Sequence, residues 1–245
     1  MDRLRGIAGE VADRRIAEVI GSVGRRLEQE QPEVINRAKE PDFHFALLNV
    51  ERAYAATGDA DLADQLMDML MERTREDGRT LVQIVLGEAL IALPKLTLRM
   101  VDGLTIVFLY RHVKFAHVQT INDYVEEFSR NVLPFLKSWP FSFGEVQHIA
   151  YTGCGTLDYS SLFDLAGHVN GEYKPLHGLN RTAFDAAMRG AHPLIDHMME
   201  EWGRSGLPRL ALNSVGIAIA HAHWRRMSGG SADLRVWIDE APTSR

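Results

Sequence analysis

Two apolar segments in the middle of the chain constrain its fold more than any other feature. Residues 81–93 and 97–112 each form a largely apolar run, and Pro94 separates them. The first run is too short for a membrane span, which needs ~20 residues, so we expect no membrane partner. A helix that is apolar on nearly all sides has to be covered by other helices. We therefore expect the two runs to form a central helical pair.

Apolar residues recur at helical spacing in the segments around this pair. Residues 42–56 predict one helix that ends at Gly58, and the aspartates that follow cap a second helix. Residues 120–139 predict a further helix with a kink at Pro134. These segments add the helices that would cover the central pair.

The last part of the chain, after residue 140, contains more glycine and shorter apolar runs. Helices are expected at residues 144–151, 160–169, 193–202 and 214–227. Leu234, Val236 and Ile238 alternate with other residue types, which predicts a β-strand. This strand needs a partner, either near Ile149 or Leu157 or in another subunit.

These patterns predict a mainly α protein with three parts. An N-terminal helix at residues 1–31 precedes a multi-helix core at residues 41–139, and a C-terminal α-rich section follows at residues 140–245. We expect the C-terminal section to contain one or two short β-strands. We also expect it to fold with the core as one cooperative unit.

The N-terminal helix carries two apolar stripes that do not line up. The residues of the two stripes are Leu4, Ile7 and Val11, followed by Ile16, Ile20, Val23 and Leu27. Arg14 and Arg15 occupy the positions where the first stripe would continue, so either the packed face rotates there or the helix changes its packing partner. Two interpretations remain open. The helix either packs against a second copy of the chain, as an oligomerisation arm, or folds onto its own domain.

Composition excludes several classes of function. The chain has 245 residues, a formal net charge of −6 and a single cysteine. The negative charge gives no general attraction for nucleic acid, so nucleic-acid binding is a minor alternative. One cysteine excludes internal disulfides and cysteine-based metal clusters, which is typical of a reducing compartment. Residues 1–30 lack the apolar core of a secretory signal, and we therefore expect a cytoplasmic protein.

Cys154 is the candidate catalytic residue. It lies between Gly153 and Gly155, where a turn would expose the thiol and neighbouring backbone N–H groups would stabilise a thiolate or an oxyanion. A nucleophilic cysteine needs a base, and the same half of the chain contains several histidines. A small buried cysteine with a packing role is the competing interpretation.

Four arginines form a basic block in a segment without acidic residues between Trp202 and Ser231. They are Arg204, Arg209, Arg225 and Arg226. Together with Trp224 they are the candidate anion-binding site, because guanidinium groups and an aromatic ring suit phosphate and base contacts. The alternative is that they pair with the acidic segment 59–77, in the same chain or in a neighbouring one.

The histidines do not predict a metal site. His192, Asp196 and Glu200 share one face of a predicted helix, but metal sites between helices need a second such element, which the sequence lacks. His221 and His223 point in different directions if they lie on a helix. We therefore predict no metal site and no cofactor.

Two motifs in the C-terminal half accompany several shorter stretches. The motifs are Tyr-Thr-Gly-Cys-Gly at residues 151–155 and Ser-Val-Gly-Ile-Ala-Ile-Ala-His-Ala at residues 214–222. The other stretches lie within residues 41–62, 81–97 and 232–238. In order and spacing they resemble an uncharacterised bacterial protein family. That resemblance covers most of the chain from Pro41 onward and implies no assigned activity.

The sequence therefore favours a non-enzymatic protein-interaction or self-assembly module. We expect it to form a homo-oligomer or to bind a protein partner whose identity the sequence leaves open. One alternative is a cysteine hydrolase that uses Cys154 with a histidine. Another is a nucleic-acid or nucleotide sensor in a bacterial defence system that uses the arginine block.

Overall fold

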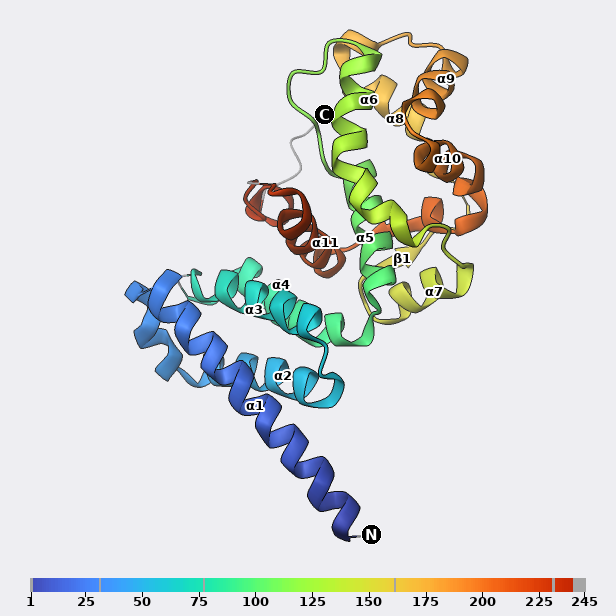
Figure 1. The fold of residues 1–245 in the computed structure, drawn as a ribbon. Helices are drawn as coiled ribbons and strands as arrows, with labels where there is room; N and C mark the ends of the chain where they lie inside the picture. The colour runs from blue at the N-terminus through green and yellow to red at the C-terminus, as the bar shows by residue number, and fades with distance from the viewer. Residues whose placement is uncertain (1, 31, 77, 161, 231, 240–245) are drawn as a thin grey trace. The chain divides into compact units, whose positions relative to one another are not determined.

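A computed structural model gives the structure of the protein over residues 2–30, 32–76, 78–160, 162–230 and 232–239. The side chains of residues 2–7, 33–35 and 38 also lie outside the described part. The described residues are mainly helical and contain a two-stranded antiparallel sheet (Figure 1). The expectation of a mainly α fold with one or two short strands is confirmed.

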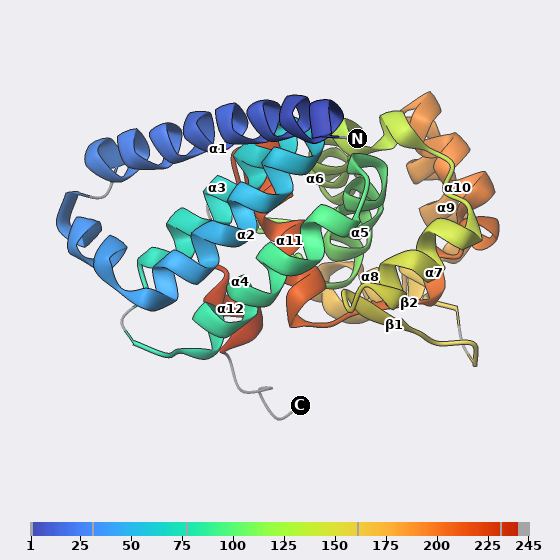
Figure 2. The same cartoon turned by 90° about the horizontal axis from the view of Figure 1, so that it is seen from below.

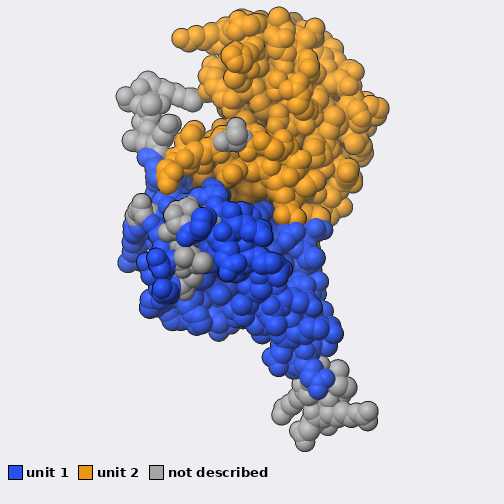
Figure 3. Space-filling model, turned by 60° about the vertical axis from the view of Figure 1, so that its left-hand side comes forward, with its two compact units in different colours: residues 1–95, 238–245 blue, residues 96–237 orange. Residues whose placement is uncertain are grey.

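The chain divides into two compact units (Figure 3). Unit 1 holds residues 1–95 and 238–245, and unit 2 holds residues 96–237. The division falls between the two apolar helices, α4 (Leu81–Ala92) and α5 (Leu98–Arg111), and not near residue 139. Periodicity shows that a helix is covered but not which neighbours cover it, so the helices that we predicted as one central pair belong to different units. Cooperative folding of the two units stays a prediction.

Unit 1 is built on α3, which contacts α1, α2 and α4. Leu66, Met69 and Leu70 of α3 have no exposed surface. The two helices predicted before and after Gly58 are confirmed as α2 and α3, and the Asp59 side chain caps α3 by accepting a hydrogen bond from the Leu62 N–H at 3.0 Å. Besides α4, unit 1 contains α1 (Asp2–Glu30), α2 (Pro41–Thr57), α3 (Ala60–Thr74) and the 3-10 helices η1 (Pro32–Lys39) and η2 (Leu93–Lys95).

Unit 2 is organised around α5, which packs most extensively against α11 (Ser214–Ser228). Its two strands, β1 (Gly155–Leu157) and β2 (Leu210–Leu212), pair antiparallel with Thr156 opposite Ala211 (Figure 2). The remaining helices are α6 (Ile121–Val132), α7 (Phe143–Tyr151), α8 (Leu165–Glu172), α9 (Arg181–Ala191), α10 (Pro193–Ser205) and α12 (Arg235–Ile238). The 3-10 helices are η3 (Leu133–Ser138), η4 (Lys174–Leu176) and η5 (Leu207–Arg209).

The predicted strand at residues 234–238 is wrong, because this segment forms the short helix α12. Leu234 is buried, and Trp237 donates a hydrogen bond from Nε1 to the His112 carbonyl at 2.8 Å. These two residues are three positions apart and share a helix face, whereas Val236 is exposed. The alternation of apolar residues over these five positions therefore does not mark a strand. The two residues that pack inward are three positions apart, which suits a helical turn.

Other boundaries also differ from expectation. Gly203 does not end α10, which continues to Ser205 and is followed by Gly206 in the left-handed conformation, with φ 80°. The helix expected from residue 160 begins at Leu165. Helix α9 and strand β2 were not predicted, because each is short and lies among glycines and prolines that suggest irregular structure.

An aromatic cluster attaches α12 to the rest of unit 2. The Trp237 ring centroid lies 5.0 Å from Phe108 and 5.3 Å from His221. The His221 Nε2 atom lies 2.8 Å from the Ala232 carbonyl oxygen. Two buried ring nitrogens, Nε2 of His112 and Nδ1 of His221, have no hydrogen-bond partner among the described residues. Burial lowers the pKa of each of these two histidines to about 4.

We predict that this cluster makes the stability of the protein sensitive to mild acid. In the unfolded chain a histidine binds a proton near pH 6.5, whereas His112 and His221 stay neutral in the fold until about pH 4. The unfolded state therefore binds more protons in that window, and the free energy of unfolding should fall as pH drops from about 6.5 to 4. The loss should be on the order of 3 kcal/mol per histidine.

Urea unfolding at a series of pH values measures this loss. His112→Gln should reduce the slope of stability against pH, because it removes one titrating group. His44→Gln is the matched control, since His44 is exposed and lies outside this cluster. An unchanged slope in the His112 variant would contradict the assignment.

Candidate functional site

The first half of α1 extends past the helix on which the second half packs. Arg15 donates a hydrogen bond from Nη1 to the Ala55 carbonyl at 2.9 Å, in the last turn of α2. The Tyr54 hydroxyl donates to Glu18 at 3.2 Å. Because α2 ends at Thr57, residues 2–14 project beyond it, as Figure 1 shows at the N-terminal end of α1. We call residues 2–14 the arm, which is about 20 Å long at 1.5 Å per residue.

Gly58 makes this arrangement possible in two ways. It ends α2 in the left-handed conformation, with φ 65°, which glycine adopts at little cost. A Cβ atom at this position would also overlap with the Arg15 guanidinium. Gly58 therefore leaves the space in which Arg15 reaches the end of α2.

The two predicted stripes of α1 have different surroundings. Val23 and Leu27 are buried in unit 1 together with Val19, which we had not included in the stripe. Ile16 is half-buried and Ile20 is 44% exposed, because the buried face follows the four-residue period from Val19. The face of α1 that is buried in unit 1 thus begins at Val19, after Arg14 and Arg15.

The first stripe lies in the arm. Val11 is half-buried, and Ala8, Gly9 and Glu10 beside it are exposed. The side chains of Leu4 and Ile7 lie outside the described residues. The helical backbone of α1 nevertheless places all three stripe positions on one face, because they are spaced by three and four residues.

A groove of about 720 Å³ lies in unit 1 between the first half of α2 and α4. Arg73 of α3 lines it, is only 8% exposed and donates from Nη2 to Asp42 at 2.7 Å. Arg73 Nε is buried without a partner among the described residues. Gly87 of α4 lies against this guanidinium, since a Cβ there would be 3.6 Å from Arg73 Nε. We call this hollow the α2/α4 groove.

Three large apolar side chains line the α2/α4 groove and are open to solvent. Phe45 is 65% exposed, Ile84 is 42% exposed and Ile91 is 44% exposed. Exposed apolar side chains that gather around a hollow are typical of a binding surface, whereas single ones are common on any protein. The groove is therefore the candidate interaction site.

The groove also carries three charged side chains that form no salt bridge among the described residues. Glu40, Arg79 and Glu88 line it and are exposed. None of the three has a salt bridge within the described part of the chain. In contrast, Arg37 donates to the carbonyls of Thr74 and Glu76 and is held in place. The free charges are thus two carboxylates and one guanidinium.

The sequence carries a signal for this groove that our predictions did not include. Leu81, Ile84 and Ile91 lie on one face of α4 and are exposed, while the buried residues of α4 lie on other faces. We interpreted a helix that is apolar on nearly all sides as fully covered. An apolar stripe beyond what the core requires is equally compatible with an exposed binding face.

Cys154 does not lie on an exposed turn but is fully buried. Its sulfur lies 3.6 Å from the Thr152 hydroxyl, which makes a weak hydrogen bond to it. Its carbonyl oxygen accepts a hydrogen bond from the Asn213 N–H at 3.3 Å. A substrate cannot reach the thiol in this conformation, so the geometry favours the packing interpretation over the catalytic one.

The glycines around Cys154 have structural roles. Gly153 has φ 83°, and a Cβ on Gly155 would overlap with the Ala211 carbonyl oxygen across the sheet. A Cβ on Gly216 would overlap with the Cys154 carbonyl oxygen. The two motifs at residues 151–155 and 214–222 therefore fit together through backbone contacts that only glycine permits.

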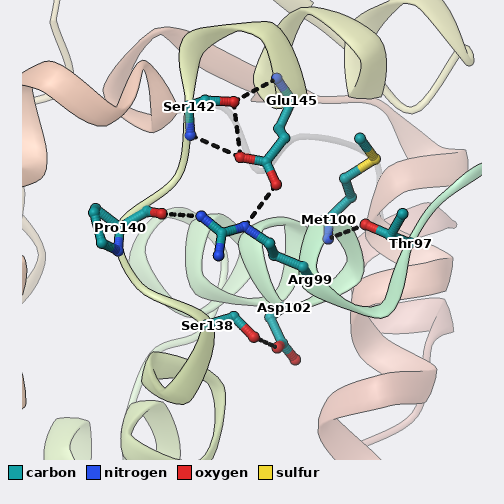
Figure 4. Close-up of polar contacts among 8 residues, drawn as sticks. All are labelled: Thr97, Arg99, Met100, Asp102, Ser138, Pro140, Ser142 and Glu145. Carbon is teal, nitrogen blue, oxygen red and sulfur yellow. Dashed lines mark hydrogen bonds and ion pairs between the residues drawn. The ribbon is translucent and has the colours of Figure 1, made fainter.

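Unit 2 also contains a buried ionisable cluster. Asp102 of α5 accepts a hydrogen bond from the Ser138 hydroxyl at 2.9 Å (Figure 4), and its other carboxylate oxygen lies 2.9 Å from His223 Nε2. The carboxylate lies between the serine and the histidine, whereas a serine-protease-type triad needs the histidine in the middle. The cluster ties α5 to η3 and α11, and its buried position suits a structural role.

A second polar contact network fixes the segment between η3 and α7. Arg99 donates from Nε to Glu145 at 2.6 Å and also to the Pro140 carbonyl (Figure 4). Ser142 and Glu145 form a reciprocal capping box at the start of α7. Partial burial acts to raise the pKa of the Glu145 carboxyl, but the hydrogen bonds from Ser142 and the pairing with Arg99 outweigh it, and the pKa is lowered.

The four arginines of the basic block lie on three elements of unit 2. Arg204, at the end of α10, pairs with Glu201 at 2.9 Å. Arg209 of η5 donates to the Tyr159 carbonyl at 3.2 Å. Arg225 and Arg226 belong to the last turn of α11. Arg204 and Arg209 are thus held by their own unit, and the anion-binding role of all four arginines stays a prediction.

Two residues of the predicted histidine and carboxylate face of α10 make contacts within the fold. His192 accepts a hydrogen bond from the Leu194 N–H at 3.1 Å and caps α10, while Asp196 pairs with Arg189 at 2.6 Å. Within the described residues, no group of three or more histidine, cysteine, aspartate or glutamate side chains is placed to hold a metal ion.

We predict that Gly216→Ala destabilises the protein by at least about 2 kcal/mol, because its Cβ would overlap with the backbone of Cys154. Urea unfolding followed by circular dichroism measures this. Gly203→Ala is the matched control, since nothing lies within 4 Å of its Cβ position in α10. That change should stabilise the helix by ~0.5–1 kcal/mol. Equal effects of the two substitutions would contradict the backbone contact.

We also predict that the Cys154 thiol reacts slowly in the folded protein, because it is buried. Modification by iodoacetamide at pH 7.5 should be at least about 100-fold slower than in the same chain unfolded in urea. Mass spectrometry over time measures both rates. A folded-state rate similar to that of the unfolded chain would show an accessible thiol and would support the hydrolase alternative.

No helix in the described part of the chain combines the length and apolar character that a membrane span requires. Comparison with curated proteins and with solved structures gives no match. A protein-family model matches residues 1–188 and, in a second overlapping segment, residues 175–238. Together these matches cover nearly the whole chain. The chain therefore belongs to this family, which is an uncharacterised one.

Proposed function

We propose that this protein is a non-enzymatic self-assembly module in which the arm of one copy binds another copy. The change of surroundings along α1 carries this proposal. After Arg15 the apolar face of α1 is buried in unit 1, and before Arg15 the helix extends past α2 while an apolar stripe continues. Full burial of such a side chain contributes about 1.5–3 kcal/mol, so the arm gains stability when a second surface covers it.

The two alternatives have less support. A cysteine hydrolase requires a thiol that substrate can reach, and Cys154 is fully buried behind a backbone contact. A nucleic-acid sensor requires arginines that converge on an anion. Here Arg204 pairs with Glu201 and Arg209 binds the Tyr159 carbonyl. The negative net charge of −6 also disfavours a polyanion as ligand.

The proposal predicts a mass in solution above the 27.5 kDa of one chain. Light scattering coupled to size-exclusion chromatography measures it over a range of protein concentrations. The double variant Leu4→Asp with Ile7→Asp should shift the distribution toward the monomer, because it places two charges in the apolar stripe of the arm.

Ile20→Asp is the matched control for this experiment. Ile20 lies on the same helix and is 44% exposed, but it is outside the arm. It should assemble like the wild type. A wild-type protein that remains monomeric at every concentration, up to several hundred micromolar, would refute the proposed function.

A further inference from the structure

We propose that unit 2 contains a binding site for a small neutral molecule that combines one aromatic ring with a hydrogen-bond acceptor. The site is a cavity of about 160 Å³ between α8, α9 and α10, next to the last turn of α5. Helix α9 packs against both α8 and α10 there (Figure 1). We call this hollow the aromatic cavity. It belongs to unit 2 and the arm belongs to unit 1, so this proposal does not depend on self-assembly.

Four aromatic rings line the aromatic cavity. They are Tyr110, Phe163, Phe184 and Trp202. Tyr110 and Phe184 are almost fully buried, with exposed fractions of 2% and 1%. A cavity of about 150 Å³ with apolar walls holds one benzene molecule, whereas pockets for drug-sized ligands measure roughly 300–1,000 Å³. The volume and the walls therefore suit a molecule with a single ring.

The wall of the aromatic cavity contains a hydrogen-bond donor that lacks an acceptor. The indole Nε1 of Trp202 is buried and has no partner among the described residues. In contrast, the Tyr110 hydroxyl donates to the Met198 sulfur at 3.2 Å, and Trp224 Nε1 donates to Asn131 at 2.8 Å. A buried N–H group without a partner destabilises the protein, and a bound acceptor would remove that cost.

Neighbouring rings hold the Trp202 indole in place. Its ring centroid lies 4.5 Å from that of Tyr110 and 6.2 Å from that of Trp139, and both pairs are nearly parallel, at 14°. The Trp139 indole also lacks a partner among the described residues, but Trp139 lies outside the cavity wall. An indole N–H donates and does not accept. The ligand therefore has to supply the acceptor at Trp202.

The charged side chains at the aromatic cavity are paired, which favours a neutral ligand. Arg181 pairs with Asp164 at 2.9 Å and with Asp185 at 3.7 Å. Arg189 pairs with Asp196 at 2.6 Å. A charged ligand would have to compete with these pairs or enter an apolar space without a counter-ion, and both cost free energy. A neutral acceptor such as a carbonyl oxygen avoids this cost.

Acetophenone is the probe that tests the proposal, because it joins one aromatic ring to a carbonyl acceptor. Two-dimensional NMR of the protein follows the indole N–H groups of its four tryptophans. Acetophenone should shift the Trp202 resonance and reach saturation below about 10 mM, as expected for a ligand of this size. The Trp224 resonance should not move, because that indole is already bonded to Asn131. If no indole resonance shifts, the cavity holds only water and the proposal is wrong.

Trp202→Phe tests the hydrogen bond, because it removes the donor and keeps an aromatic ring. α-Methylstyrene is the matched probe, since it has the shape of acetophenone but a CH₂ group in place of the carbonyl oxygen. The substitution should weaken acetophenone binding about 10-fold more than α-methylstyrene binding. Ligand-detected NMR measures both affinities in both proteins. The comparison isolates the hydrogen bond, because the change in cavity volume affects both probes. An equal loss for the two probes would refute the proposed acceptor.

Ala166→Leu tests the location of the site. Ala166 of α8 lines the aromatic cavity, so a larger side chain there should fill it and abolish the shift caused by acetophenone. Ala183→Leu is the matched control, since Ala183 is exposed on α9 outside the cavity wall, and this variant should bind like the wild type. Circular dichroism checks that both variants fold. Unchanged binding by folded Ala166→Leu would place the ligand elsewhere and contradict the proposal.

Discussion

The contact between Arg15 and the last turn of α2 divides α1 into a part that packs within unit 1 and a part that projects beyond α2. Arg15 binds a carbonyl group near the C-terminal end of α2, where helix carbonyls lack partners and a positive charge is favourable. Gly58 provides the space for this guanidinium. From this point onward α1 packs within the unit, and before it α1 extends as an arm. One residue pair thus separates the half of α1 that packs within unit 1 from the half for which we propose an interaction.

In unit 2, the glycines of the two conspicuous motifs allow close contacts between backbone segments. The glycines at 155 and 216 allow main-chain atoms to approach, and the Cys154 carbonyl lies in the space that Gly216 leaves. The buried Asp102 links α5 to α11 through His223. Together these contacts account for the most distinctive residues of the C-terminal half without assigning any of them a reaction.

Much of the fold was predictable because apolar residues at helical spacing and N-cap residues mark the helices in the sequence. Asp59, Thr80 and Thr97 cap the helices that follow them, as the sequence suggested for the aspartate after Gly58. The segment at 234–238 was not predictable in this way, because five residues are too few to distinguish a period of two from one of three. Its Trp237 packs on residues more than a hundred positions away. Such long-range contacts leave no local signal.

The candidate site was only half predictable for a related reason. The offset of the two stripes of α1 at Arg14 and Arg15 is a local pattern, and the sequence showed it. The α2/α4 groove is formed by side chains from η1, α2, α3 and α4, so its existence depends on tertiary packing. Arg73 illustrates the difference, since nothing in its neighbourhood in sequence marks it as a buried guanidinium beside Gly87.

The central claim is that a second copy of the chain covers the arm in the assembled protein. Hydrogen–deuterium exchange at low and high protein concentration tests it most directly. The account predicts that amide exchange in residues 2–14 slows at high concentration. Unchanged exchange in these residues while the mass increases would contradict the account.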